Sequence, residues 1–306
     1  MSDISAVSFD RVTKRYGKTL AVDALSLEVR RGEMFGLIGP DGAGKTTSVR
    51  LMCGLLHGDE GSARIVGLDP VKDHRRITSA VGYLSQRFSL YGDLSVDENI
   101  AFFAEIHGVG HYGPRRDQLL DMMQLTRFRD RLADKLSGGM KQKLALACTL
   151  VHEPEIILLD EPTTGVDPVS RREFWKLLSQ FLAGGITIVM TTPYLDEAER
   201  CSRVALLDRG RLLALDTPQA LRSSLPGTLL EVIVPDVRRA HHVLRERGLR
   251  AQVFGDRLHV WTDTARDEAA DAFARLSGPL IGDSQVRPIT PSLEDVYIAR
   301  VSGELS

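Results

Sequence analysis

The sequence predicts an α/β protein with a parallel sheet, and two stretches of the chain support this prediction. The apolar run Met34–Ile38 reads as a buried strand; it is followed by the glycine-rich segment Gly39–Thr46 and by a helical pattern over Thr47–Leu56. This order of strand, loop and helix is the context that the phosphate-binding motif GxxxxGK[ST] requires. A second run, Ile156–Leu159, is uniformly apolar, as expected of a central parallel strand, and leads into Asp160–Glu161.

Length and composition limit the possible classes of protein. The 306 residues allow about two domains, and 39 basic against 41 acidic residues leave no positive field to recruit nucleic acid. The three cysteines, Cys53, Cys148 and Cys201, are far apart, which favours a reducing cytoplasm and three buried thiols over disulfides or zinc. No secretory signal and no apolar run of about 18 residues is present, so we expect no direct membrane insertion.

The phosphate loop predicts a nucleotide site with defined roles for its residues. Its glycines let the backbone approach the phosphates, and the loop N–H groups and the helix N-terminus supply partial positive charge. Lys45 is expected to reach the β- and γ-phosphates, and the Thr46 hydroxyl to ligate Mg²⁺. The predicted nucleotide-binding residues here are Gly39, Pro40, Asp41, Gly42, Ala43, Gly44, Lys45, Thr46 and Thr47.

A short segment between the loop and the acidic strand makes the prediction more specific. Leu136–Gln142 reads LSGGMKQ and precedes the strand that ends in Asp160–Glu161. With the phosphate loop, these motifs resemble the ATP-binding cassette (ABC) family over residues 4–224. The resemblance implies an ABC cassette, that is, a RecA-like core with an antiparallel β subdomain and a helical subdomain at about 88–150. It also implies a dimer, in which the LSGG segment of one subunit closes over ATP held by another.

The resemblance further assigns roles to residues that the motifs place. Glu161 is expected to be the general base, with Lys45 and Gln86 as the other catalytic residues, and Thr46, Gln86 and Asp160 are expected to hold Mg²⁺. Tyr16 would stack on adenine, and Ser137, Gly138 and Gly139 would contact the ATP of the opposite subunit. Asp41 departs from the family pattern, in which asparagine is commoner. Aromatic residues between 88 and 103 are candidates for a dock for the membrane partner.

One family residue is missing. After the strand Ile186–Thr192, the family's usual TTHYLDEAE corresponds here to a segment in which Pro193 replaces the switch histidine. Proline offers no donor from its side chain or its backbone nitrogen. Three explanations stay open: the site hydrolyses slowly and serves regulation, Thr192, Tyr194 or a water substitutes, or a partner ATPase subunit provides a competent second site.

The chain beyond Pro226–Gly227 predicts a small second domain, residues 225–306. Leu229–Val234 reads as a strand, Arg238–Arg247 as a helix, Gln252–Trp261 as a hairpin and Asp267–Leu276 as a helix. This order favours a small α+β domain of the split βαβ kind. Pro291–Tyr297 resembles the C-terminal segment of ABC-2-type exporter ATPases.

These observations predict the ATP-binding and ATP-hydrolysing subunit of an ABC-2-type exporter, with ATP and Mg²⁺ as cofactors. Its expected partners are integral membrane permease subunits and a second ATPase subunit, identical or homologous, and its expected place is the cytoplasmic face of the membrane. Nucleic acid is not an expected partner. The rival hypothesis is a soluble ABC ATPase that acts on ribosomes or serves regulation. Against it, the chain has one cassette, and only a short stretch separates Gln86 from Ser137.

Overall fold

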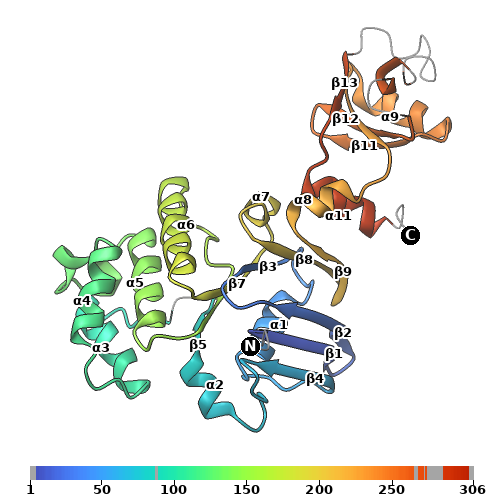
Figure 1. Ribbon diagram of the computed structural model, residues 1–306. Helices are drawn as coiled ribbons and strands as arrows, with labels where there is room; N and C mark the ends of the chain where they lie inside the picture. Colours follow the sequence, from blue (N-terminus) through green and yellow to red (C-terminus); the bar gives the residue numbers. More distant parts are fainter. Residues whose placement is uncertain (1–4, 87–88, 265–267, 272, 274–284, 303–306) are drawn as a thin grey trace. The chain divides into compact units, whose positions relative to one another are not determined.

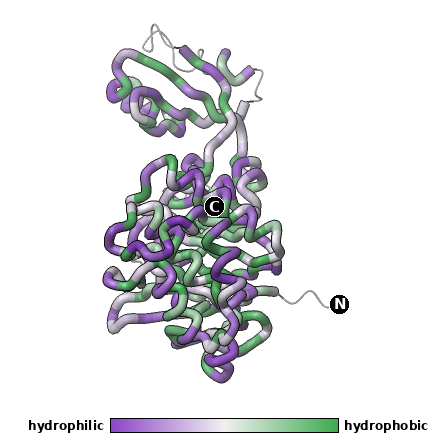
Figure 2. Tube along the Cα trace, turned by 90° about the vertical axis from the view of Figure 1, so that its left-hand side faces the viewer, coloured by the Kyte–Doolittle hydropathy of each residue, from purple (hydrophilic) through white to green (hydrophobic). Residues whose placement is uncertain are grey.

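The computed structural model describes residues 5–86, 89–264, 268–271, 273 and 285–302 and divides into two compact units, Met1–Pro218 and Gln219–Ser306 (Figure 1). The boundary thus falls at helix α8 (Pro218–Ser223), slightly before the boundary at 224–225 expected from the sequence. Apolar segments run through the interior of each unit and polar segments lie mostly outside (Figure 2).

A six-stranded sheet forms the centre of the first unit. Its strand order is β5-β6-β7-β3-β8-β9, parallel from β5 to β8 and antiparallel only between β8 and β9. All five residues of both β3 and β6 are buried, which explains their uninterrupted apolar sequence. The strands are β3 (Met34–Ile38), β5 (Val81–Leu84), β6 (Ile156–Asp160), β7 (Thr187–Thr192), β8 (Arg203–Asp208) and β9 (Arg211–Asp216).

A second, antiparallel sheet packs its apolar side into the same core. Its order is β2-β1-β4, with β1 (Val7–Tyr16), β2 (Thr19–Val29) and β4 (Glu60–Ile65). Phe9, Val12 and Leu25 of this sheet share one buried cluster with Phe35 of β3 and Val49 of α1 (Lys45–Met52). The two sheets thus hold α1, and the loop that precedes it, between them.

Helices account for most of the chain between β5 and β6. α3 (Val96–Ile106), α4 (Gly113–Met122) and α5 (Gly138–Leu150) pack together (Figure 1). Ser95 closes a capping box with Glu98 at the start of α3. Other helices described in this unit are α2 (His74–Ala80), α6 (Pro168–Ala183), α7 (Leu195–Ala198) and two short 3-10 helices, Thr126–Phe128 and Ala133–Lys135. The predicted helical segment and the α/β fold class are confirmed.

The second unit contains one antiparallel sheet of order β11-β12-β10-β13. With α9 between β10 and β11, this order is that of a split βαβ arrangement, as predicted. Its elements are β10 (Thr228–Ile233), α9 (Val237–Glu246), β11 (Arg250–Phe254), β12 (Arg257–Thr262), β13 (Gln285–Ile289) and α11 (Leu293–Val301). The helix expected at 267–276 lies partly outside the described residues, and β13 and α11 were not predicted.

A buried contact between a carboxylate and a histidine joins α11 to the sheet of the second unit. Asp295, 1% exposed, lies with its carboxylate 2.6 Å from Nδ1 of His259 on β12, and it accepts hydrogen bonds from the backbone nitrogen and hydroxyl of Ser292. Burial raises the pKa of the Asp295 carboxyl, but the hydrogen bonds from His259 and Ser292 hold it below its usual value. The ionised form is therefore the one that stabilises the folded unit.

We expect Asp295→Asn to lower the free energy of unfolding of the second unit by about 2 kcal/mol at neutral pH, because a charge-assisted hydrogen bond is lost. Since the folded-state pKa is depressed, the stabilisation is present above the unfolded pKa. It disappears as the pH falls below about 4, and so should the difference between variant and parent. Trp261 lies in this unit and Trp175 in the other, so fluorescence-detected urea unfolding in a Trp175→Phe background isolates the relevant transition. Asp256→Asn, at an exposed carboxylate, is the control and should change little. An equally stable Asp295→Asn variant would contradict this role.

Candidate functional site

The predicted phosphate-binding, acidic and glutamine residues lie at the ends of four adjacent strands. β5, β6, β7 and β3 are parallel neighbours, so their carboxyl ends meet along one edge of the sheet. Ligands bind along this edge in open parallel sheets. Gln86 follows β5, Asp160 ends β6, Thr192 ends β7 and the phosphate loop follows β3.

The phosphate loop folds tightly around the Lys45 side chain. The ammonium group, 4% exposed, donates to the carbonyls of Gly39 at 2.8 Å and Pro40 at 3.1 Å. Gly44 has φ 96°, and a Cβ atom there would lie 2.5 Å from the Ala21 carbonyl oxygen, so no other residue fits. No side chain caps the N-terminus of α1, so its first N–H groups can donate to an anion held by the loop. This is the structure of an anion-binding cradle.

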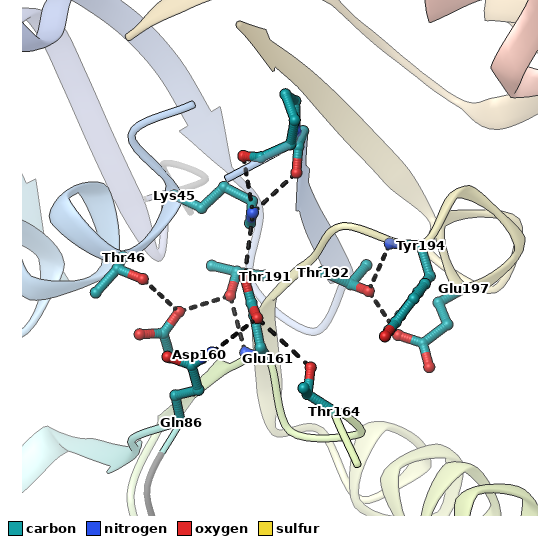
Figure 3. A network of polar contacts seen from close by, with 12 residues as sticks. Lys45, Thr46, Gln86, Asp160, Glu161, Thr164, Thr191, Thr192, Tyr194 and Glu197 are labelled. Atoms are coloured by element: carbon teal, nitrogen blue, oxygen red, sulfur yellow. Dashed lines mark hydrogen bonds and ion pairs between the residues drawn. The ribbon is translucent and has the colours of Figure 1, made fainter. Parts of the chain in front are cut away.

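Glu161 lies in the centre of a polar network with Lys45. Its carboxylate is 3.1 Å from Nζ of Lys45, and it accepts hydrogen bonds from Nε2 of Gln86 at 3.0 Å and from the Thr164 hydroxyl at 3.5 Å (Figure 3). Lys45 therefore balances the charge of Glu161. A phosphate entering the cradle would compete for the same ammonium group.

Asp160, 1% exposed, forms the second acidic centre. Its Oδ1 accepts from the hydroxyls of Thr46 at 3.1 Å and Thr191 at 2.7 Å (Figure 3). A threonine hydroxyl beside a buried carboxylate is a set of hard oxygen atoms, and Mg²⁺ binds such a set. The two predicted metal ligands Thr46 and Asp160 are thus adjacent, while Gln86 bonds to Glu161 instead.

The backbone of Glu161 is in the left-handed region, with φ 48°. A non-glycine residue adopts this conformation only where its surroundings enforce it, and such positions cluster at functional sites. Here the enforcement comes from Thr191, whose hydroxyl and carbonyl oxygens accept from the Glu161 N–H at 2.9 and 3.2 Å. Thr191 thus orients both acidic residues. Sequence reasoning missed it, because the pairing of β7 with β6, which brings Thr191 beside Asp160, cannot be read from the chain.

A cavity of about 510 Å³ opens beside the phosphate loop. Tyr16, 46% exposed, forms part of its wall, as does Asp41. The position of the Tyr16 ring suits stacking on a flat base. The other residues around the cavity are Thr19, Leu20, Ala21, Gly42, Ala43, Gly44, Lys45, Thr46, Thr47, Gln86 and Glu161.

The LSGG residues do not line this cavity. Ser137 caps α5, accepting from the Met140 N–H at 3.4 Å, and Gly138 and Gly139 are the first residues of the helix. Ser137 and Gly138 are exposed, whereas a Cβ atom on Gly139 would lie 2.2 Å from Oγ of Ser170. The segment therefore presents an exposed helix N-terminus away from the phosphate loop of its own chain.

The side-chain hydrogen bonds described around Pro193 join Thr192 to its neighbours in the chain. The Thr192 hydroxyl donates to Glu197 at 2.7 Å and accepts from the Tyr194 N–H at 3.0 Å. The Tyr194 ring lies on the far side of Thr192 from Lys45 (Figure 3), and the Arg171 guanidinium carbon is 5.4 Å from its centroid. In this arrangement neither the Thr192 hydroxyl nor the Tyr194 ring is directed at the phosphate cradle.

Comparison with known proteins identifies the family. Residues 22–164 match the ABC transporter family. Over 307 residues, 99% of both chains, the sequence is 36% identical to the Nod factor export ATP-binding protein I of Burkholderia thailandensis. The chain belongs to the ABC transporter family. It is an ATP-binding cassette of that family, in agreement with the resemblance seen in its motifs.

Other relatives carry related names. A probable multidrug ABC transporter ATP-binding protein of Escherichia coli, YbhF, is 40% identical over 291 residues, and the chain spans about half the length of that relative (49%) but 92% of its own. The daunorubicin resistance ATP-binding protein DrrA2 of Streptomyces coeruleorubidus is 35% identical over 319 residues, covering 97% of this chain and 95% of that one.

Solved structures agree on the fold of the cassette. An ATP-binding subunit of an ABC transporter is 28% identical, with a TM-score of 0.66, and the match covers 72% of this chain and 93% of that one. The ATP-binding cassette MJ0796, solved as a dimer bound to ADP and Pi in a post-hydrolysis state, is 27% identical, with a TM-score of 0.63 and coverages of 69% and 98%. The predicted ABC cassette fold is confirmed.

Among the described residues, no helix is long and apolar enough to cross a membrane, and no three or more histidine, cysteine, aspartate or glutamate side chains gather as a metal site. The three cysteines are buried, as expected. Burial raises the pKa of each thiol, that of Cys201 to about 12, which keeps the thiols protonated. They carry no part of the site.

Proposed function

We propose that this chain is the ATP-hydrolysing subunit of an ABC-2-type exporter, which works in pairs and drives transport through separate membrane subunits from the cytoplasmic face. The observation that carries the proposal is the meeting of Lys45, Glu161 and the Thr46–Asp160 pair on one sheet edge, beside a cavity that Tyr16 borders.

The chemistry requires positioning and electrostatic stabilisation more than bond-making by the protein. The loop N–H groups and Lys45 would hold the β- and γ-phosphates, and Glu161 would accept the proton of the attacking water. Gln86, which bonds to Glu161, would orient that water. Mg²⁺, held by Thr46 and Asp160 with a contribution from Gln86, would offset charge on the phosphates.

The pairing of two subunits is supported by the place of the LSGG segment. Ser137 and Gly138 are exposed, and the α5 N-terminus favours negative charge. Because this N-terminus does not line the cavity of its own chain, we propose that it meets the γ-phosphate of ATP on a second subunit, identical or homologous. The dimeric form of MJ0796 supports this proposal by analogy.

A cavity of about 240 Å³ between the core and the helical segment offers a dock for the membrane subunit. Leu55, Tyr83 and Phe103 line it, and Phe103 continues into the edge-to-face ring contacts of Phe102 and Tyr91. Leu55 and Tyr91 are 56% and 45% exposed, which makes an apolar surface suited to a partner helix. Phe88, expected to take part, lies outside the described residues.

Export is favoured over a soluble role by the names of the relatives, which refer to multidrug, Nod factor and daunorubicin resistance proteins. The alternative of a purely regulatory subunit rests on Pro193 in place of the switch histidine. The rate at which the chain hydrolyses MgATP tests it.

The proposal predicts that the tagged chain, recovered from its host in mild detergent, brings a polytopic membrane protein with it and hydrolyses MgATP. Leu55→Asp should reduce recovery of that protein at least tenfold without changing ATP binding. Val71→Asp, at a site of similar exposure (60%) outside this cavity, is the matched control. Recovery with ribosomes, or of the chain alone, would contradict the transporter assignment.

A further inference from the structure

The last two residues of β7 connect to two separate networks. Side chains alternate between the faces of a strand, and accordingly Thr191 bonds to Asp160 and to the backbone of Glu161, whereas Thr192 bonds to Glu197. Pro193 comes next in the chain. The end of β7 therefore touches the acidic site residues on one side and Glu197 of α7 on the other (Figure 3).

Glu197 is a buried carboxylate with both oxygens occupied. It is 1% exposed; Oε1 accepts from the Thr163 hydroxyl at 2.6 Å and Oε2 from the Thr192 hydroxyl at 2.7 Å. Nε of Arg171 lies 3.8 Å from Oε1 and supplies the compensating charge. A carboxylate buried at this depth is costly unless it is paired and hydrogen-bonded, and these short contacts meet that condition.

The Thr163 contact reaches the loop that carries Glu161. Thr163 follows Glu161 by two positions, and its neighbour Thr164 bonds to the Glu161 carboxylate at 3.5 Å. Two adjacent residues of the loop are thus held by carboxylates: Thr164 by Glu161 and Thr163 by Glu197. Through one carboxylate, Glu197 joins this loop to the end of β7.

We propose that Glu197 is a positioning residue for ATP hydrolysis, which fixes the end of β7 and the Glu161 loop relative to each other; the inference rests on the proposed function. Within the segment 192–194, the Thr192 hydroxyl and the Tyr194 N–H are committed to other partners, Pro193 has no donor, and the Tyr194 ring lies on the far side of Thr192 from Lys45 (Figure 3). The link through Glu197 is the direct side-chain bridge from this segment to the loop. Glu197 itself is not among the residues that line the cavity beside the phosphate loop.

The inference predicts a separation of turnover from binding. With the full chain, Glu197→Ala should lower kcat for MgATP at least tenfold and leave the Kd for MgATP within about twofold, since misplacement near 1 Å can cost about 10²-fold in rate. Glu197→Gln keeps the shape and part of the hydrogen bonding, so its kcat should lie between those of the wild type and Glu197→Ala. Thr163→Val removes one hydroxyl and should lower kcat in the same direction. Combined with Glu197→Ala, it should add no further loss.

The matched control is Glu33→Ala. Glu33 is also a buried carboxylate (8% exposed), bonded to the Arg30 N–H and the Arg203 guanidinium at the amino end of β3, away from the site. It should affect thermal stability but not kcat. If Glu197→Ala fails to fold, Thr163→Val and Glu197→Gln decide. If both of these variants keep the wild-type kcat, Glu197 has no positioning role. The same conclusion follows if MgATP affinity falls as much as kcat does. A wild-type chain that neither binds nor hydrolyses MgATP overturns the proposed function instead.

Discussion

Replacing Glu161 by glutamine is expected to lower the rate of ATP hydrolysis by about 10³-fold while MgATP still binds. In the structure the Glu161 carboxylate lies at the end of β6, within reach of Lys45, Gln86 and Thr164. Glutamine is nearly isosteric but cannot accept the proton of the attacking water, and general acid–base catalysis contributes about 10²–10⁴-fold. Removing the negative charge also frees Lys45 for the phosphates, so affinity should be unchanged or higher.

The measurement is single-turnover hydrolysis of MgATP, with equilibrium binding on the same preparation. Glu173→Gln serves as the control, because this carboxylate is 46% exposed on α6 and pairs with Lys143. If Glu161→Gln hydrolysed ATP at the wild-type rate, another group would have to be the base. If it lost ATP binding as well, Glu161 would be a structural partner of Lys45.

The central strands and the motifs between them were predictable because their physical signals are local. β3 and β6 are uniformly apolar since both faces of a parallel sheet are covered. The phosphate loop can be predicted from the sequence because its glycines occupy backbone conformations that other residues rarely adopt, such as the φ of 96° at Gly44. Helix starts were less certain. α1 begins two residues earlier than predicted, a difference within the usual uncertainty of helix ends.

The residues that sequence reasoning missed act through contacts distant along the chain. Thr191 is an ordinary strand threonine until β6 lies beside it, and Glu197 belongs to an acidic stretch that reads as a solvated helix surface. The burial of Glu197 depends on Thr163, far back in the sequence. In the second unit, β13 contains Pro288, which argues against a central strand, but β13 is an edge strand.

Changing Pro193 to histidine is expected to raise kcat for MgATP by about ten- to a hundredfold. A single well-aimed donor to transition-state charge is worth about 10²–10³-fold in oxyanion-hole cases. The Thr192 hydroxyl and the Tyr194 N–H are already committed to other partners, and the Tyr194 ring lies on the far side of Thr192 from Lys45 (Figure 3), so a histidine would add a side-chain donor at position 193, where proline has none.

The gain should depend on Glu161. In a Glu161→Gln background, Pro193→His should give little or no increase, since both residues act on the same chemical step. Pro235→His, in an exposed loop of the second unit, controls for the substitution itself. An increase independent of Glu161 would point to a step other than chemistry. An unchanged kcat would mean that position 193 does not limit hydrolysis, leaving the geometry held by Thr191 and Glu197 as the element that makes this site competent without a histidine.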